Sequence, residues 1–129
     1  MKDTIKFLNI SNHVLTDEQI TDLNKNFPLE VEIVELPVDL KKNWSSLNPV
    51  NYKAVCDNII DFMKENDINH AHLAGFMPAV MSLYIDYRYL TEYNAHFYYS
   101  FSERVSEERE VNGEIVKTSV FKHRGWYEY

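Results

Sequence analysis

Short apolar runs alternate with longer stretches in which apolar residues recur at helical spacing. The runs have the length and composition of buried strands, and the stretches between them have the periodicity of amphipathic helices. The runs are residues 5–10 (IKFLNI), 31–36 (VEIVEL), 70–74 (HAHLA) and 95–101, and the helical stretches are residues 17–27, 50–66 and 79–93. The pattern therefore predicts alternating strands and helices through the first hundred residues.

Capping and helix-breaking residues support these boundaries. Thr16 with Gln19 three residues later forms a capping-box pattern at the start of the first helix, and Pro28 ends that helix. Pro78 suits the first turn of the third helix, where its missing N–H would have no partner in any case. The polar segment 39–49 has no helical or strand periodicity and is expected to be irregular.

The last third of the chain has the pattern of a long β-hairpin. Val, Thr, Phe and Tyr alternate with charged residues on both sides of an Asn-Gly dipeptide at 112–113, which favours a two-residue turn. Counting back from such a turn without a bulge, Ser102 faces His123 and Arg104 faces Phe121. Ser102, Arg104 and His123 are then expected on one face of the hairpin.

Strands that alternate with helices predict an α/β fold with a mainly parallel sheet, flanking helices and the C-terminal hairpin, in one domain over residues 1–129. Parallel sheets of this kind bind ligands at the carboxyl ends of their strands. The expected ligand-binding residues at those ends are Ser11, Asn12, His13, Gly75, Phe76 and Ser100.

The composition bears on whether the protein binds nucleic acid or a membrane, and on the compartment in which it is found. The formal net charge of −7 argues against binding of long nucleic acids, which favours a basic surface, but leaves room for a small anion on a local basic patch. The apolar runs are too short to span a bilayer, and the start Met1-Lys2-Asp3 does not resemble a signal peptide. The single cysteine, Cys56, excludes an internal disulfide and fits a reducing compartment. The sequence therefore predicts a cytoplasmic protein without a membrane partner.

The hairpin face carries the candidate chemistry. A hydroxyl, a guanidinium and an imidazole together suit an anion such as phosphate, which favours a site at Ser102, Arg104 and His123. Lys117, farther along the hairpin, is a further candidate for contact with an anion. The alternative interpretation of this face is a solvated ribbon surface that binds nothing.

The histidine and tyrosine clusters are better explained by structural roles than by metal binding or base stacking. His70, His72 and His96 invite comparison with a metal site, but His70 and His96 lie at the amino ends of their strands and no carboxylate or cysteine completes a ligand set. Neither a metal nor a cofactor is therefore expected. Aromatic residues at helical spacing favour core packing and a dimer interface over base stacking, and these are Tyr84, Tyr87, Tyr89 and Tyr93.

Three segments carry a family resemblance that extends over nearly the whole chain: residues 99–104 (YSFSER), 112–113 (NG) and 120–129 (VFKHRGWYEY). With the order of elements, they resemble the small stand-alone CRISPR-associated Csx proteins, which are similar to CARF domains and include ring nucleases of type III systems. The resemblance implies a Rossmann-like (CARF-like) form of the sheet. Around Gly75 the chain departs from the family pattern, because Phe76 stands where a small or acidic residue is expected.

The resemblance implies binding and metal-independent cleavage of a cyclic oligoadenylate, with cyclic tetra-adenylate favoured, to switch off type III CRISPR signalling. A ribose 2′-OH would attack its own 3′-phosphate and leave a 2′,3′-cyclic phosphate, so the protein mainly holds the geometry and stabilises charge. Arg104 would supply the charge, and His123 would move a proton or contact phosphate. Ser102 and Ser11 would supply hydrogen bonds.

A symmetric ring ligand also suits a homodimer. Two other functions fit the same residues: a non-catalytic cyclic-nucleotide sensor or sponge, and a protein-interaction module in which the aromatic hairpin docks a protein.

Overall fold

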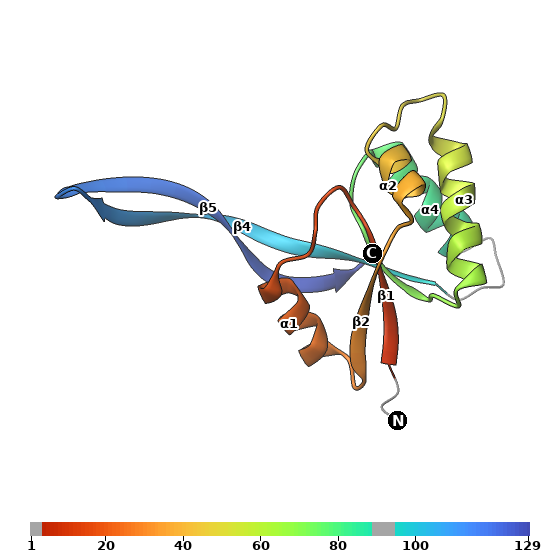
Figure 1. Cartoon of the computed structure of the whole chain (residues 1–129), viewed down its shortest axis with the longest axis horizontal. Coiled ribbons are helices and arrows are strands. Elements are labelled where there is room, and N and C mark those ends of the chain that lie inside the picture. Colours follow the sequence, from red (N-terminus) through yellow and green to blue (C-terminus); the bar gives the residue numbers. More distant parts are fainter. Residues whose placement is uncertain (1–3, 89–94) are drawn as a thin grey trace.

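The computed structural model describes residues 4–88 and 95–129 and shows a mixed α/β fold (Figure 1). The elements follow one another as β1 (Thr4–Ile10), α1 (Asp17–Asn26), β2 (Glu30–Glu35), α2 (Val38–Trp44), α3 (Tyr52–Glu65), β3 (His70–Leu73), α4 (Met77–Arg88), β4 (His96–Val111) and β5 (Glu114–Glu128). The predicted alternation of strands and helices is confirmed over this part of the chain. Tyr89 and Tyr93, and with them the end of the predicted helix 79–93, lie outside the described residues.

The sheet has five strands in the order β2-β1-β3-β4-β5. β2, β1, β3 and β4 run parallel, and β5 pairs antiparallel with β4 to form the C-terminal hairpin. The expected mainly parallel sheet with a C-terminal hairpin is therefore confirmed. Ile10 pairs with Leu73, so the carboxyl ends of β1 and β3 lie side by side.

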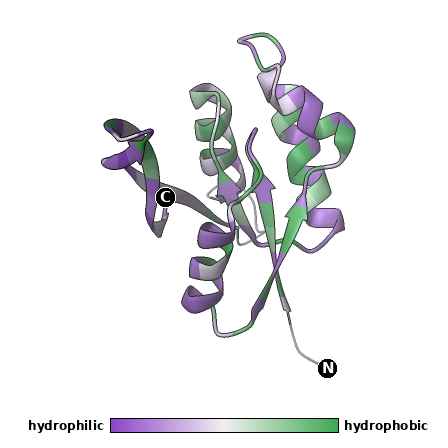
Figure 2. Cartoon of the chain, turned by 60° about the vertical axis from the view of Figure 1, so that its left-hand side comes forward, coloured by the Kyte–Doolittle hydropathy of each residue, from purple (hydrophilic) through white to green (hydrophobic). Residues whose placement is uncertain are grey.

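Helices cover both faces of the parallel part of the sheet, with α1 on one face and α2, α3 and α4 on the other (Figure 1). The larger apolar core lies under the three helices and includes Leu8, Ile59 and Leu83. The smaller core lies under α1 and includes Phe7 and Leu23. α1 is mostly hydrophilic in Figure 2, because it buries only one narrow stripe against the sheet.

One segment that was expected to be irregular is a helix. α2 begins after Pro37 and ends at Trp44, whose side chain is buried and whose indole N–H donates to the carbonyl of Ala74 over 3.1 Å. The prediction was wrong because a seven-residue helix spans about two turns, too few for a periodic pattern to be visible. α4 begins at Met77, so Pro78 lies in its first turn as predicted.

The hairpin projects far beyond the rest of the molecule (Figure 1). Its two-residue turn has Asn112 at φ 53° and Gly113 at φ 81°, as the Asn-Gly pair predicts. From this turn back to the pair of Ser102 with His123, every facing pair is the one predicted by counting.

A bulge interrupts the pairing at the base of the hairpin. Phe101 pairs with Gly125, so β5 carries Arg124 as one extra residue, and the prediction of an unbroken register is wrong from here on. Strict alternation would place His123 and Trp126, three residues apart, on opposite faces. The extra residue brings both onto the face toward α1, where their ring centroids lie 5.6 Å apart.

Candidate functional site

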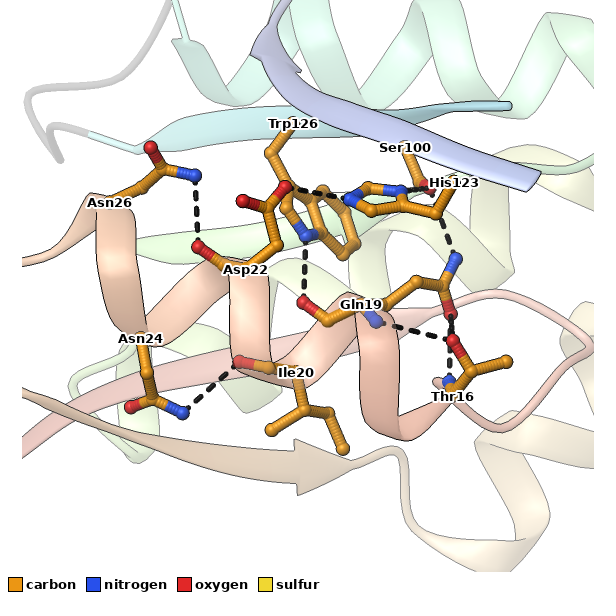
Figure 3. A network of polar contacts seen from close by, with 9 residues as sticks. All are labelled: Thr16, Gln19, Ile20, Asp22, Asn24, Asn26, Ser100, His123 and Trp126. Carbon is orange, nitrogen blue, oxygen red and sulfur yellow. Dashed lines mark hydrogen bonds and ion pairs between the residues drawn. The ribbon is translucent and has the colours of Figure 1, made fainter. Parts of the chain in front are cut away.

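His123 is held between two polar side chains from distant parts of the chain (Figure 3). Its Nδ1 lies 2.6 Å from Ser100 Oγ and its Nε2 lies 2.8 Å from Asp22 Oδ2, and only 6% of its side chain is exposed. The Gln19 amide donates to Ser100 Oγ over 3.0 Å, which leaves the serine proton free to point at the imidazole. A neutral His123 with its proton on Nε2, toward Asp22, satisfies all these hydrogen bonds.

α1 presents the partners of His123 because its start is rigidly capped. Thr16 Oγ1 accepts from the Gln19 backbone N–H over 3.2 Å, and Gln19 Oε1 accepts from the Thr16 N–H over 2.8 Å. Gln19 and Asp22 are three residues apart and therefore share one face of the helix, the face toward the hairpin. The Trp126 indole N–H donates to the Gln19 carbonyl over 3.0 Å and fixes the base of the hairpin against α1.

Two shallow hollows border His123, both between α1 and the hairpin. One, of about 300 Å³, is lined by Glu18, Thr21, Asp22, Lys25, His123 and Arg124. The other, of about 220 Å³, is lined by Thr16, Glu18, Gln19, Ser102, Phe121 and His123. Carboxylates and cations together line the larger hollow, whereas Glu18 lines the smaller one without a lysine or arginine, so only the larger hollow offers positive charge to an anion.

Of the predicted hairpin residues, Ser102 and His123 line these hollows, whereas Arg104 lines neither of them. Ser102 faces His123 across the strands and lines the smaller hollow. Arg104, one step farther out on the same face, lies over the ring of Phe121 with its guanidinium carbon 5.1 Å from the ring centroid. The structure therefore brings Ser102, Arg104 and His123 to one face and adds Ser100 beside them.

Ser11 belongs to a second, buried polar cluster on the same side of the sheet. Asn9 Oδ1 accepts from Ser11 Oγ over 2.8 Å and lies 2.9 Å from His72 Nδ1, and the Asn9 amide donates to the His13 carbonyl over 2.7 Å. Ser11 is only 3% exposed, so its hydroxyl holds the loop after β1 together. Asn12 and His13 are exposed at the tip of this loop.

Burial lowers the pKa of His72 to about 4, with a smaller contribution from the nearby His13. His72 is therefore neutral at pH 7, and its ring meets the Trp126 indole edge to face at 5.1 Å between centroids. The Trp126 ring also lies against His123, so it connects the buried cluster of Asn9, Ser11 and His72 with the cluster around His123. Both clusters lie beneath α1.

The depressed pKa of His72 predicts a pH-dependent loss of stability. The unfolded chain takes up a proton near pH 6.5 and the folded chain only near 4, so stability present at pH 7 is lost as the pH falls between these values, by about 3 kcal/mol at pH 4. Urea unfolding at both pH values measures the loss, and His72→Gln should lose about 3 kcal/mol less than the wild type. Equal losses in the two proteins would contradict this assignment.

Gly75 and Phe76 lie away from His123, under the helices of the opposite face. Gly75 has a φ of +149°, and a Cβ there would come within 2.9 Å of Trp44 Nε1, so glycine is needed for the tryptophan to pack. Phe76 packs against the same core, with its ring 6.2 Å from that of Tyr52. The departure from the family pattern at Phe76 thus coincides with a packing role.

Lys117 lies toward the tip of the hairpin, where it faces Glu108 and its Nζ is 3.9 Å from that carboxylate. Six residues separate it from His123, about 20 Å along a strand. Within one chain, Lys117 is therefore remote from the cluster around His123.

The histidines at the amino edge of the sheet pack on one another and against Glu128. His70 stacks on His96 with ring centroids 5.2 Å apart, and His96 Nδ1 lies 2.5 Å from a carboxylate oxygen of Glu128. No group of three or more potential metal ligands occurs within residues 4–88 and 95–129. Nor is any helix in this part of the chain long and apolar enough to cross a membrane.

Comparison with known proteins identifies the family. The sequence model of the family described as "Uncharacterized protein MJ1673 family" matches residues 5–127. The chain belongs to this family. A relative, "Uncharacterized protein MJ1673" from Methanocaldococcus jannaschii, is 27% identical over 130 residues that cover 96% of each chain. No solved structure matches the chain.

The family match includes α1 and nearly all of the hairpin, and hence both polar clusters. Neither description names an activity. Sequence reasoning missed the partners of His123, namely Asp22 and Gln19, because 101 residues separate Asp22 from His123. The capping-box pattern did single out Gln19, but as a helix cap only.

Proposed function

We propose that this chain is a cytoplasmic ring nuclease with a CARF-like, Rossmann-like sheet. It binds a cyclic oligoadenylate, with cyclic tetra-adenylate as the favoured ring, cleaves it without a metal ion and so switches off type III CRISPR signalling. The observation that carries the proposal is the imidazole of His123, held between Asp22 and Ser100 at the border of two hollows. The resemblance of the hairpin to stand-alone Csx proteins gives the substrate class.

The proposed reaction is an attack by the substrate on itself. The 2′-oxygen of one ribose forms a bond to the adjacent phosphorus, the bond from phosphorus to the 5′-oxygen breaks, and a 2′,3′-cyclic phosphate and a 5′-hydroxyl result. Both ring nitrogens of His123 are engaged, so the 2′-OH proton reaches Nδ1 through the Ser100 hydroxyl. Asp22 stabilises the imidazolium that forms, and the imidazolium later returns a proton to the 5′-oxygen.

Positive charge near His123 supports the phosphate. The Arg104 guanidinium is exposed and, among the described residues, has no carboxylate within ion-pairing distance. Lys25 and Arg124 line the larger hollow, although Arg124 Nε lies 3.3 Å from Glu103. Arg104 therefore serves as the stabiliser of the developing charge on the phosphoryl oxygens.

Incubation of the purified protein with labelled cyclic tetra-adenylate tests the proposal. Cleavage to linear products with 2′,3′-cyclic phosphate ends is the expected result. A ring that is bound but recovered intact would identify a sensor or sponge. A ring that is neither bound nor cleaved would refute the nucleotide function and favour a protein-interaction module.

Cleavage is expected to survive EDTA at millimolar concentration, since the substrate supplies the nucleophile and the protein supplies the charge. The rate of product formation is measured with and without the chelator, after dialysis to remove loosely bound ions. Loss of activity that a divalent cation restores would refute the metal-independent mechanism, but it would leave the cyclic oligoadenylate as the ligand.

A further inference from the structure

One face of the hairpin carries an apolar stripe along its length. The bulge at Arg124 shifts the alternation of β5, so the aromatic residues at the base and the valines farther out share the face opposite His123. Tyr99 stacks on Tyr127 with ring centroids 5.8 Å apart. The stripe is formed by Tyr99, Phe101, Val105, Val116, Val120 and Tyr127.

The stripe is open to solvent in a single chain. Phe101 is 43% exposed, Tyr127 51% and Val116 40%. At the base it continues onto α4 through Tyr129, whose ring lies 6.0 Å from that of Tyr84. An apolar surface that runs from a helix onto a strand pair is typical of a protein–protein interface.

The projecting part of the hairpin, called the arm below, would gain stability from a partner. Outside the body of the molecule it is a two-stranded ribbon (Figure 1), and an isolated two-stranded ribbon is marginally stable in water. Packing of a second apolar face on the stripe would supply the missing burial.

We infer that the partner is a second copy of this chain, whose arm packs face to face on this one in the opposite direction. Charges along the stripe select this partner. Near the base, Glu103 on β4 is negative and Lys122 on β5 is positive, whereas near the tip Arg109 on β4 is positive and Glu114 on β5 is negative. Glu107 adds a negative charge to this face of β4, and Glu103 also lies 3.3 Å from Arg124 Nε in its own chain.

A two-fold axis between the arms and perpendicular to the strands places β4 on β4 and β5 on β5, each pair running in opposite directions. Glu103 then meets Arg109 of the second copy, and Lys122 meets Glu114. The midpoint of the first charge pair, on β4, and the midpoint of the second, on β5, lie within one residue of facing each other across the hairpin. A single two-fold axis can therefore bring both charge pairs together. The face with His123 stays open in each copy, and the inference does not depend on the proposed function.

Sedimentation equilibrium of the full chain at 1–100 µM tests the arm dimer. Val105→Lys with Val120→Glu puts an attractive pair at facing positions of the ribbon but destroys the stripe, and should raise the dissociation constant at least about 100-fold. The matched control is Ser106→Lys with Ser119→Glu, a facing pair on the opposite face, which should stay dimeric.

Charge exchange provides a second test that leaves the stripe intact. Lys122→Glu and Glu114→Lys should each weaken the dimer about 10-fold, and the double variant should recover most of the loss. Far-UV circular dichroism checks that each variant is folded. A wild-type protein that is monomeric at 100 µM, or charge variants without mutual rescue, would overturn the arm dimer.

Discussion

His123→Ala is expected to slow the cleavage of cyclic tetra-adenylate by about 10²–10⁴-fold, the usual contribution of a positioned acid or base. The imidazole connects the Ser100 hydroxyl with the Asp22 carboxylate, so its loss breaks the path of the proton. Single-turnover rates with saturating protein isolate this step from substrate binding. A rate within threefold of the wild type would exclude His123 as the group that moves the proton.

The variants around His123 separate chemistry from packing. Asp22→Asn keeps the size of the side chain but removes its charge, and should lower the rate while ring binding changes little. Ser100→Ala removes the hydroxyl that passes the proton and should approach the effect of His123→Ala. Lys122→Ala, on the opposite face of the hairpin, should leave the single-turnover rate unchanged. Thermal melting of each variant shows whether the contact between α1 and the hairpin survives.

Local sequence patterns predicted the parts of the fold that depend on local physics. The alternating apolar runs gave the mainly parallel sheet, and the Asn112-Gly113 turn gave the register as far as Ser102 and His123. The bulge was missed, although Gly125 within a strand is a recognised sign of one. α2 was missed because its stability comes from the buried Trp44 and not from periodicity.

The residues of the candidate site also separate into those that local strand pairing predicts and those that depend on how distant elements pack. Ser102, Arg104 and His123 could be grouped by counting along two strands, because strand pairing is set by the nearby turn. The contact of His123 with Asp22 depends on how α1 packs on the sheet, which no spacing in the sequence encodes. Ser11 could not be recognised as an internal hydrogen-bond donor for the same reason, since its acceptor Asn9 is fixed by His72 from another strand.

Arg104→Ala is expected to slow cleavage by about 10²–10³-fold, by analogy with the deletion of one donor to a developing oxyanion. The exposed guanidinium rests on the Phe121 ring, so its removal should cost the folded protein little and the transition state much. Arg104→Lys keeps the charge but loses the planar fork that matches a phosphate, and should recover only part of the rate.

Two further variants decide whether charge at this position is what matters. Phe121→Leu removes the aromatic surface under the guanidinium and should give a smaller loss than Arg104→Ala, because the arginine remains but is less well oriented. Lys53→Ala removes one exposed positive charge from α3, on the other side of the sheet, and should leave the rate unchanged. If Lys53→Ala is as slow as Arg104→Ala, the effect is one of net charge, and the hairpin face is not the site. If Arg104→Ala alone is slow, the phosphate lies beside His123 on that face.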